Sequence, residues 1–303
     1  MKKNKIIIIF ILIIIAIGVS IVGTKKSPPD DVWEKYYERS SDQKQEDEPE
    51  QEESIKEITI YDIEDGYMKV PYNDQATQNT YNWEEHLTNN NGIYSYEDDV
   101  YTSKLGVDVS SYQKNINWKK VKEAGVEFAI LRLGYRGYGE SGKLVEDPMF
   151  EKNYANAKKE GIEIGVYFFS QSVNEDEIKE EAEFVCQKLE GKEISYPVVF
   201  DLEKIKNDEA RTDNLTTEEI TSMTEKFCQL IKEKGYTPCI YGNAKTFTTK
   251  MKLEQFNDYS KWYADYQEKP IYIYDFEMWQ YTETGKINGI SGNVDLNLQF
   301  IKK

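Results

Sequence analysis

Histidine is nearly missing from this chain. Of its 303 residues only His86 is a histidine, and it lies in an acidic, Asn-rich stretch. Ser-His-Asp triads, Cys-His pairs and HExxH zinc sites all place histidine beside the reacting group. The sequence therefore excludes these mechanisms and disfavours a metal-dependent amidase or endopeptidase. We expect no cofactor and no metal ion.

Cysteine is also scarce. The three cysteines, Cys186, Cys228 and Cys239, are an odd number, and none lies in a CxxC motif. A disulfide framework or a cysteine-based zinc site is therefore poorly supported, and buried free thiols are expected. A bridge between Cys228 and Cys239 stays open, because spacing alone does not decide it.

A basic stripe is missing as well. The net charge is −17, and residues 1–103 supply −11 of it, with 10 Lys and Arg against 21 Asp and Glu. Only −6 is left for residues 104–303. Binding to nucleic acid needs clustered Lys and Arg that neutralise phosphates, so nucleic acid is excluded as a partner.

The chain begins with a long apolar run. A basic start, MKKNK, precedes residues 6–22, in which only Gly18 and Ser20 are not strongly apolar. We interpret residues 1–24 as an uncleaved transmembrane signal-anchor, with a cleaved export signal as the alternative. The excess of Lys before the run places the body of the protein outside the cytoplasm, or in the medium if the segment is cleaved.

The rest of the chain divides by composition into three parts. Residues 25–56 are dense in Glu, Asp, Gln and Ser, and we expect a disordered acidic linker there. Residues 57–103 carry apolar residues without a clear period, and we expect an N-terminal extension that packs on the following domain. Residues 104–303 are expected to form that main domain.

The main domain alternates between apolar runs of strand length and amphipathic segments of helix length. Strands are expected at residues 105–109, 128–133, 164–169, 197–202, 237–241, 261–264, 276–281 and 294–298. Helices are expected at residues 118–124, 147–160, 175–190 and 217–234. Runs that are apolar on both faces and separated by helices indicate a mostly parallel sheet. About eight strands with fewer helices predict an α/β fold, an irregular TIM-like β/α barrel, with an open doubly wound sheet as the alternative.

Four acidic residues lie at or next to the ends of predicted strands. Asp201 and Glu203 close an apolar run and are spaced two apart, which places them on one face of a strand. Asp108 and Asp295 hold equivalent positions in two other strand segments. In a β/α barrel, functional side chains lie at the carboxyl ends of the strands. Because a cluster of like charges would destabilise a site kept only for structure, the four acids predict a carboxylate-based active site.

Aromatic residues are expected at the same edge of the barrel. Five of them follow or close predicted strands: Tyr112, Tyr167, Tyr241, Trp262 and Trp279. Flat rings with polar tips suit a groove that binds the faces of sugars. The chain has 23 Tyr, so core packing is the competing interpretation. Arg132 also ends a predicted strand, where it would either neutralise the acids or form an ordinary buried salt bridge.

Seven sequence blocks resemble, in order, the glycoside hydrolase family 25 lysozymes, which are muramidases. The blocks are Gly106-Val-Asp-Val-Ser-Ser-Tyr-Gln113, Gly165-Val-Tyr-Phe-Phe169, Val199-Phe-Asp-Leu-Glu203, Ile240-Tyr-Gly242, Trp262-Tyr-Ala-Asp-Tyr266, Met278-Trp-Gln-Tyr281 and Gly292-Asn-Val-Asp-Leu-Asn297. The resemblance implies a flattened, irregular β/α barrel over residues 104–303, with the site in a groove at the strand carboxyl ends. It also implies cleavage of the β-1,4 bond between N-acetylmuramic acid and N-acetylglucosamine in peptidoglycan glycan strands.

The resemblance further implies roles for the acids. Glu203 would be the general acid, with a raised pKa supplied by apolar surroundings and by the charge of Asp201. Asp201 would stabilise the positive charge of the transition state by orienting the acetamido group of the substrate, and direct nucleophilic attack is the rival mechanism. The other matched residues would contact the sugars: Asp108, Asp295, Tyr167 and Trp279.

Two positions depart from the family pattern. Phe168 stands where many relatives have His. Asp265 is an acid where none is expected, and two alternatives stay open for it, a further acid of the groove or a surface residue. Two other functions stay open. A chitinase-like glycosidase also ends a strand in Asp-x-Glu, although Val199 stands where its pattern has Asp. A catalytically silent wall-binding protein would keep the groove as an attachment site.

The N-terminal segment suggests how a muramidase activity would be used. An enzyme tethered to the membrane by residues 1–24 would cut the cell's own wall close to the surface. We therefore hypothesise a role in wall remodelling or in the assembly of an envelope-spanning machine. Deleting residues 1–26 would then spare the activity and release the enzyme into the medium.

Overall fold

The computed structural model describes residues 56–205 and 208–303. The expected anchor, residues 1–24, and all but the last residue of the expected linker, residues 25–56, lie outside the described residues. Within the described ranges, no helix is long and apolar enough to cross a membrane.

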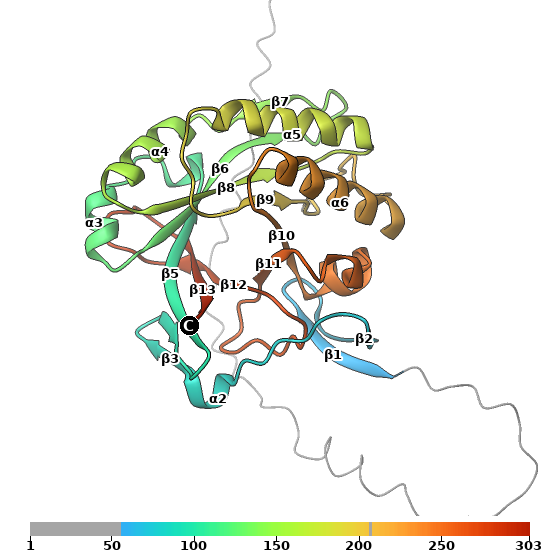
Figure 1. Cartoon of the computed structure of the whole chain (residues 1–303), viewed down its shortest axis with the longest axis horizontal. Helices are drawn as coiled ribbons and strands as arrows, with labels where there is room; N and C mark the ends of the chain where they lie inside the picture. Colours follow the sequence, from blue (N-terminus) through green and yellow to red (C-terminus); the bar gives the residue numbers. More distant parts are fainter. Residues whose placement is uncertain (1–55, 206–207) are drawn as a thin grey trace, which may run out of the picture. The chain divides into compact units, whose positions relative to one another are not determined.

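Eight strands close into a barrel (Figure 1). In spatial order they are β5 (Tyr101–Val109), β13 (Val294–Lys302), β12 (Met278–Gly285), β11 (Ser260–Ala264), β10 (Pro238–Asn243), β9 (Val198–Asp201), β8 (Glu163–Phe169) and β6 (Phe128–Arg136). Pairing of β5 with β6 closes the ring, and a short ninth strand, β7 (Leu144–Glu146), pairs with β6. The predicted barrel is confirmed, and the open doubly wound alternative is wrong.

The direction of β13 differs from that of the other barrel strands. The pairings from β5 through β6, β8, β9, β10 and β11 to β12 are all parallel, whereas β13 runs antiparallel to both of its neighbours. Asp295 is therefore at the start of its strand and not at the carboxyl end. Its position is still at the active edge, because β13 is reversed and Asp295 lies opposite Asp108 of β5.

Four helices cover one side of the barrel (Figure 1). They are α3 (Trp118–Glu123), α4 (Phe150–Lys159), α5 (Glu175–Leu189) and α6 (Thr217–Glu233), close to their predicted bounds. Side-chain caps fix where three of them begin; Asn174 caps α5, and Thr216 forms a capping box with Glu219 at α6. Helices α4 and α5 contact β6, α4 also contacts β8, and α6 contacts β9 and β10.

Residues 57–96, which belong to the expected N-terminal extension, pack against barrel strands that these four helices do not cover. They form β1 (Glu57–Asp62), β2 (Gly66–Pro71), α2 (Trp83–His86), β3 (Leu87–Asn90) and β4 (Ile93–Tyr96). Strand β4 contacts β5 and β13. The Trp83 ring stacks on Phe276 at 6.1 Å between centroids, and the Tyr81 hydroxyl donates to the carbonyl of Phe276 at 2.8 Å. Large aromatic rings thus cover this side of the barrel, where the only α-helix of the described residues is the single turn α2.

The three cysteines are free thiols. Cys228 and Cys239 are fully buried, and Cys186 is half-buried. Burial raises the pKa of the Cys239 thiol to about 12, so it stays protonated and behaves as a small apolar side chain. The expectation of free thiols is confirmed, and the alternative bridge between Cys228 and Cys239 is not formed.

Candidate active site

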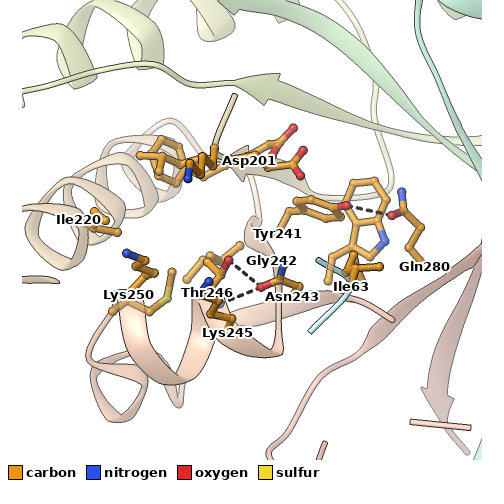
Figure 2. Close-up of a pocket in the computed structure, with 18 of the residues that line it drawn as sticks. Ile63, Asp201, Ile220, Tyr241, Gly242, Asn243, Lys245, Thr246, Lys250 and Gln280 are labelled. Carbon is orange, nitrogen blue, oxygen red and sulfur yellow. Dashed lines mark hydrogen bonds between the residues drawn. The ribbon is translucent and has the colours of Figure 1, made fainter. Parts of the chain in front are cut away.

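A cavity of about 470 Å³ opens at the carboxyl ends of the parallel strands. Its walls come mainly from β9, β10, β11 and the segments that follow them, as Figure 2 shows for Asp201, Tyr241 and Asn243. Seven of the nine predicted site residues line it: Asp108, Asp201, Glu203, Asp295, Tyr167, Tyr241 and Trp262. The predicted convergence of the four acids is therefore observed.

Asp201 and Glu203 form the first of two carboxyl pairs. Asp201 is the last residue of β9 and is only 4 % exposed, and its side chain is hydrogen-bonded to Glu203. Burial, followed by the charge of Glu203, raises the pKa of Asp201 well above its usual range. At neutral pH the pair therefore holds one proton between two carboxyl groups. The Oδ1 atom of Asp201 is buried and meets no hydrogen-bond donor among the described residues.

Asp108 and Asp295 form the second carboxyl pair. Asp108 Oδ2 accepts hydrogen bonds from Asn297 Nδ2 at 2.8 Å and from Gln280 Nε2 at 3.0 Å. The side chains of Asp108 and Asp295 are also hydrogen-bonded to each other. Burial and the charge of Asp108 raise the pKa of Asp295 to about 10. Asp295 therefore carries the proton at neutral pH, and the two amides hold Asp108 as its acceptor.

Two side-chain amides connect this second pair to the aromatic wall. Gln280 Oε1 accepts from the hydroxyls of Tyr241 at 2.8 Å, drawn in Figure 2, and of Tyr266 at 3.0 Å. Asn297 Oδ1 accepts from Trp262 Nε1 at 2.8 Å. Each amide thus donates to Asp108 and accepts from an aromatic side chain, which fixes the orientation of the rings. Burial keeps the pKa of Tyr241 well above its usual range, so its hydroxyl remains a donor.

Two predicted substrate contacts do not line the cavity. Trp279 is 0 % exposed, and its Nε1 donates to the carbonyl of Asp265 at 2.8 Å. Trp279 neighbours Gln280 on β12, and because successive strand residues face opposite sides, its ring points away from the cavity that Gln280 lines. Tyr112 is 65 % exposed and lies outside the cavity, with its ring centroid 5.2 Å from the guanidinium of Arg132. Their role in substrate contact stays a prediction.

The structure also answers two questions about charged residues. Arg132 forms an ion pair with Asp147 at 2.8 Å, and its charge also acts to lower the pKa of Asp201, so both alternatives for Arg132 have support. Asp265 is neither a groove acid nor a surface residue, because it is fully buried beneath the cavity wall. Its carboxylate accepts from the Tyr263 hydroxyl and from the backbone N–H of Gln267, both at 2.9 Å, and it therefore shapes the turn after β11.

Three residues of the site were not assigned from the sequence. Gln280 and Asn297 lie within the matched blocks. Asn297 is two residues from Asp295 on β13, and Gln280 is two residues from Met278 on β12, so strand alternation could have indicated their direction. Gln171 carries no sequence signal. It is fully buried, its Nε2 donates to the carbonyl of Glu203 at 3.0 Å, and its Oε1 accepts from the Thr212 hydroxyl at 3.1 Å. Gln171 thus holds the chain that carries Glu203.

A metal site is not apparent in the part of the chain that the structure describes, where no group of three or more His, Cys, Asp or Glu side chains is arranged to hold an ion. The carboxyl groups of the cavity instead pair with each other and with amides. This arrangement suits proton transfer and hydrogen bonding to a neutral polar substrate.

Comparison with known proteins assigns the chain to a family. The model of glycosyl hydrolases family 25 matches residues 107–290. YegX of Escherichia coli is 28% identical over 197 residues, covering 64% of this chain and 68% of that protein. An autolytic lysozyme of Clostridium acetobutylicum is 26% identical over 193 residues, covering 63% of this chain and 54% of that protein.

A solved structure shares the fold. The modular autolysin LytC of Streptococcus pneumoniae superposes with a TM-score of 0.60 at 22% identity, covering 81% of this chain and 58% of that one. The chain thus spans little more than half the length of the autolysin and of the clostridial lysozyme. The family match covers more than half of this chain. It includes three of the four acids and ends before Asp295. The chain belongs to glycosyl hydrolases family 25.

Proposed function

We propose that the chain is a muramidase that hydrolyses the β-1,4 bond between N-acetylmuramic acid and N-acetylglucosamine in peptidoglycan, with Glu203 as the general acid. Membership of glycosyl hydrolases family 25 supports the reaction class. The similar clostridial protein is an autolytic lysozyme, and the similar pneumococcal autolysin has also been solved with a synthetic peptidoglycan ligand. Both relatives support peptidoglycan as the substrate.

The Asp201–Glu203 pair is the observation that carries this proposal. A general acid must hold a proton at neutral pH and must reach the glycosidic oxygen. The pair holds one proton, and Glu203 lines the cavity. The Oδ1 atom of Asp201 has no donor among the described residues, so the N–H of a substrate acetamido group can donate to it. That hydrogen bond favours the ionised form of Asp201 and moves the shared proton to Glu203.

The chemistry then follows in two steps. As the glycosidic bond breaks, its oxygen takes the proton of Glu203 while the acetamido carbonyl oxygen of the same sugar forms a bond to the anomeric carbon. Water then attacks the anomeric carbon, gives a proton back to Glu203 and releases the acetamido group. Asp201 orients the acetamido group through its N–H and stabilises its positive charge. Burial of Asp201 and its bond to Glu203 favour this role over direct nucleophilic attack.

The second carboxyl pair would support the first. Asp108 is the ionised member, and its charge adds to the electrostatic field at Asp201. Together with Tyr167 and Tyr241, the pair offers donors and acceptors for sugar hydroxyls along the same wall. We therefore propose that Asp108 and Asp295 bind the sugar and maintain the negative potential that stabilises an oxocarbenium-like transition state.

The N-terminal segment leads to a proposal for the place of action. Residues 1–24 would anchor the enzyme with its catalytic domain outside the cytoplasm, so that it cuts nearby wall during remodelling or assembly of an envelope machine. The basic start and the apolar run of the sequence support it. Expression of the full chain and of residues 27–303 tests it. The full chain should be found in the membrane fraction, and the shorter chain should be found in solution and still be active. Native protein free in the medium would favour a cleaved signal.

Mass spectrometry of fragments released from purified peptidoglycan tests the reaction itself. The chain should release fragments that end in reducing N-acetylmuramic acid, and the Glu203→Gln variant should not. Chitin oligosaccharides serve as the control substrate and should not be cleaved. Tight sedimentation with the wall without any cleavage would instead indicate a silent wall-binding protein.

A further inference from the structure

The tip of the β1–β2 hairpin forms part of the catalytic cavity. Asp62, Ile63 and Glu64 line it together with the four acids. Figure 2 shows Ile63 on the side of the cavity where Tyr241 and Gln280 lie. The hairpin spans residues 57–71, whereas the family match begins at residue 107. This chain therefore builds one wall of its cavity from a segment outside the matched region.

The hairpin is held firmly in this position. Ile60 and Val70, on its inner face, are buried in the main hydrophobic core, and β2 contacts the short helix η2 (Thr246–Lys250). At the tip, Asp65 forms an ion pair with Lys245, which itself lines the cavity. Next to the tip, Tyr67 accepts a hydrogen bond from Gln267 Nε2 at 3.0 Å. A wall with such contacts is preorganised and does not need to close over the substrate.

The tip presents the chemistry that binds sugars. Asp62 is 1 % exposed; its Oδ1 holds the turn by accepting from the backbone N–H groups of Glu64 at 3.0 Å and Asp65 at 2.9 Å. Its Oδ2 is buried and has no donor among the described residues. Ile63 packs against the cluster that contains Tyr241 and Trp262. A lone carboxylate oxygen beside an apolar and aromatic surface suits a ligand with a hydroxyl or amide donor and an apolar ring face.

We propose that Asp62 and Ile63 form an additional sugar-binding subsite, occupied by a unit of the glycan strand outside the disaccharide that is cleaved. The inference rests on the proposed muramidase function. In this subsite a sugar hydroxyl or acetamido N–H donates to Asp62 Oδ2, and the sugar ring covers Ile63. The cavity thereby contacts more sugar units of the glycan strand than the matched domain would contact alone.

Kinetics on peptidoglycan glycan oligosaccharides of increasing length tests the subsite. For the full chain, kcat/KM should rise with length until the subsite is filled. In Asp62→Asn the Oδ1 atom still holds the turn, but an amide donor replaces the free acceptor. The ratio of kcat/KM for long over short oligosaccharides should fall about tenfold, mainly through KM, because a charged acceptor is lost. Ile63→Ala should lower the same ratio by several-fold.

Two more variants separate the subsite from the hairpin's structural role. Asp65→Ala removes the ion pair to Lys245 from a residue that does not line the cavity, and it should lower the ratio by less than Asp62→Asn. Lys69→Ala, on the same hairpin but pairing outward with Glu57, is the matched control and should not change the ratio.

Three results would overturn the subsite. They are an unchanged ratio in both Asp62→Asn and Ile63→Ala, an equal loss of kcat/KM at every length, and a gain on long strands, which would make the tip an obstruction. If the wild-type chain cleaves no oligosaccharide of any length, the muramidase assignment itself fails. A variant that does not fold is replaced by the other, since Asp62 and Ile63 contribute separately.

Discussion

Each carboxyl pair of the cavity contains one buried aspartate, Asp108 or Asp201. The pairs differ in the exposure of the second acid, because Glu203 is exposed and Asp295 is half-buried, and they differ in their partners. Asp108 and Asp295 share a proton, and two amides complete the shell of Asp108. Asp201 and Glu203 also share a proton, but Asp201 Oδ1 is left without a donor in the described part of the chain. Buried polar atoms are rarely left unpaired without a functional reason. We therefore interpret the Asp108–Asp295 pair as a fixed support, and the Asp201–Glu203 pair as the place where the substrate supplies the missing donor.

The largest effect is expected at the general acid. Glu203→Gln keeps the size of the side chain but removes the transferable proton, so kcat should fall roughly a thousandfold. Release of reducing ends from peptidoglycan measures it. Binding to the wall, followed by sedimentation, is the control and should persist. A rate close to that of the wild type would remove Glu203 from its assigned role.

Asp201→Asn should have the next largest effect. The amide can neither share the proton nor stabilise the charged acetamido group, and we expect kcat to fall roughly a hundredfold. KM should change little, because the loss is confined to the transition state. A matched rise of KM with unchanged kcat would mean that Asp201 only binds the sugar.

The pH dependence distinguishes the pairs further. Activity requires one proton on the Asp201–Glu203 pair, so kcat/KM should fall by about tenfold per pH unit on both the acid and the alkaline limb. Because the pKa of Asp201 is raised, the alkaline limb should begin above the usual range of carboxyl groups. Rates measured from acid to alkaline pH test this expectation, and a flat alkaline limb would contradict it. In Asp201→Asn that limb should move, whereas in Asp295→Asn it should not.

Gln171 offers a test of positioning. Gln171→Ala removes the donor to the Glu203 carbonyl and the acceptor of Thr212, and we expect kcat to fall about tenfold with little change in KM. The exposed Gln229→Ala on α6, whose side chain bonds only to Glu225 in the described structure, is the matched control. A loss of melting temperature without a change of kcat would make Gln171 a purely structural residue.

The smallest loss of activity is expected from Asp295→Asn, which should also stabilise the fold. Asp295 is neutral at pH 7, and Asn keeps a donor for Asp108, so kcat should fall only a few-fold. In the folded chain its pKa is raised to about 10, so folded-state stability falls as pH rises from about 4, the unfolded value, towards 10. Asn does not ionise, so the variant does not lose this stability as pH rises. Its melting temperature should exceed that of the wild type at pH 7, and the difference should shrink near pH 4.

Much of the barrel could be predicted because local pattern determines it. The α6 helix was expected at residues 217–234 and spans Thr217–Glu233, since its apolar period and its cap are both local signals. The reversal of β13 could not be predicted, because a buried run reads the same in parallel and antiparallel pairing. The predicted convergence of the acids is observed nonetheless, because the reversed direction of β13 brings Asp295, at the start of this strand, to the edge where the parallel strands end.

The cavity was predicted less completely than the barrel. Sequence pattern identified the acids by their position near strand ends, but it gave no direction for Trp279, which alternates with Gln280 on the same strand. The other features of the cavity depend on contacts between residues that are far apart in the sequence. The hydrogen bond from Gln171 to Glu203 spans 32 positions, and the ion pair between Asp65 and Lys245 spans 180. No local period reports contacts of that separation, so the hairpin wall was visible only in the structure.

The anomeric configuration of the fresh product tests the central claim most directly. The direct contact between Asp201 and Glu203 leaves no space between them for an attacking water, which favours a two-step reaction through the acetamido group. Proton NMR, recorded during cleavage of glycan oligosaccharides before mutarotation, should show β-configured reducing N-acetylmuramic acid first. Initial appearance of the α anomer would mean single-step inversion, and it would contradict the role assigned to the Asp201–Glu203 pair.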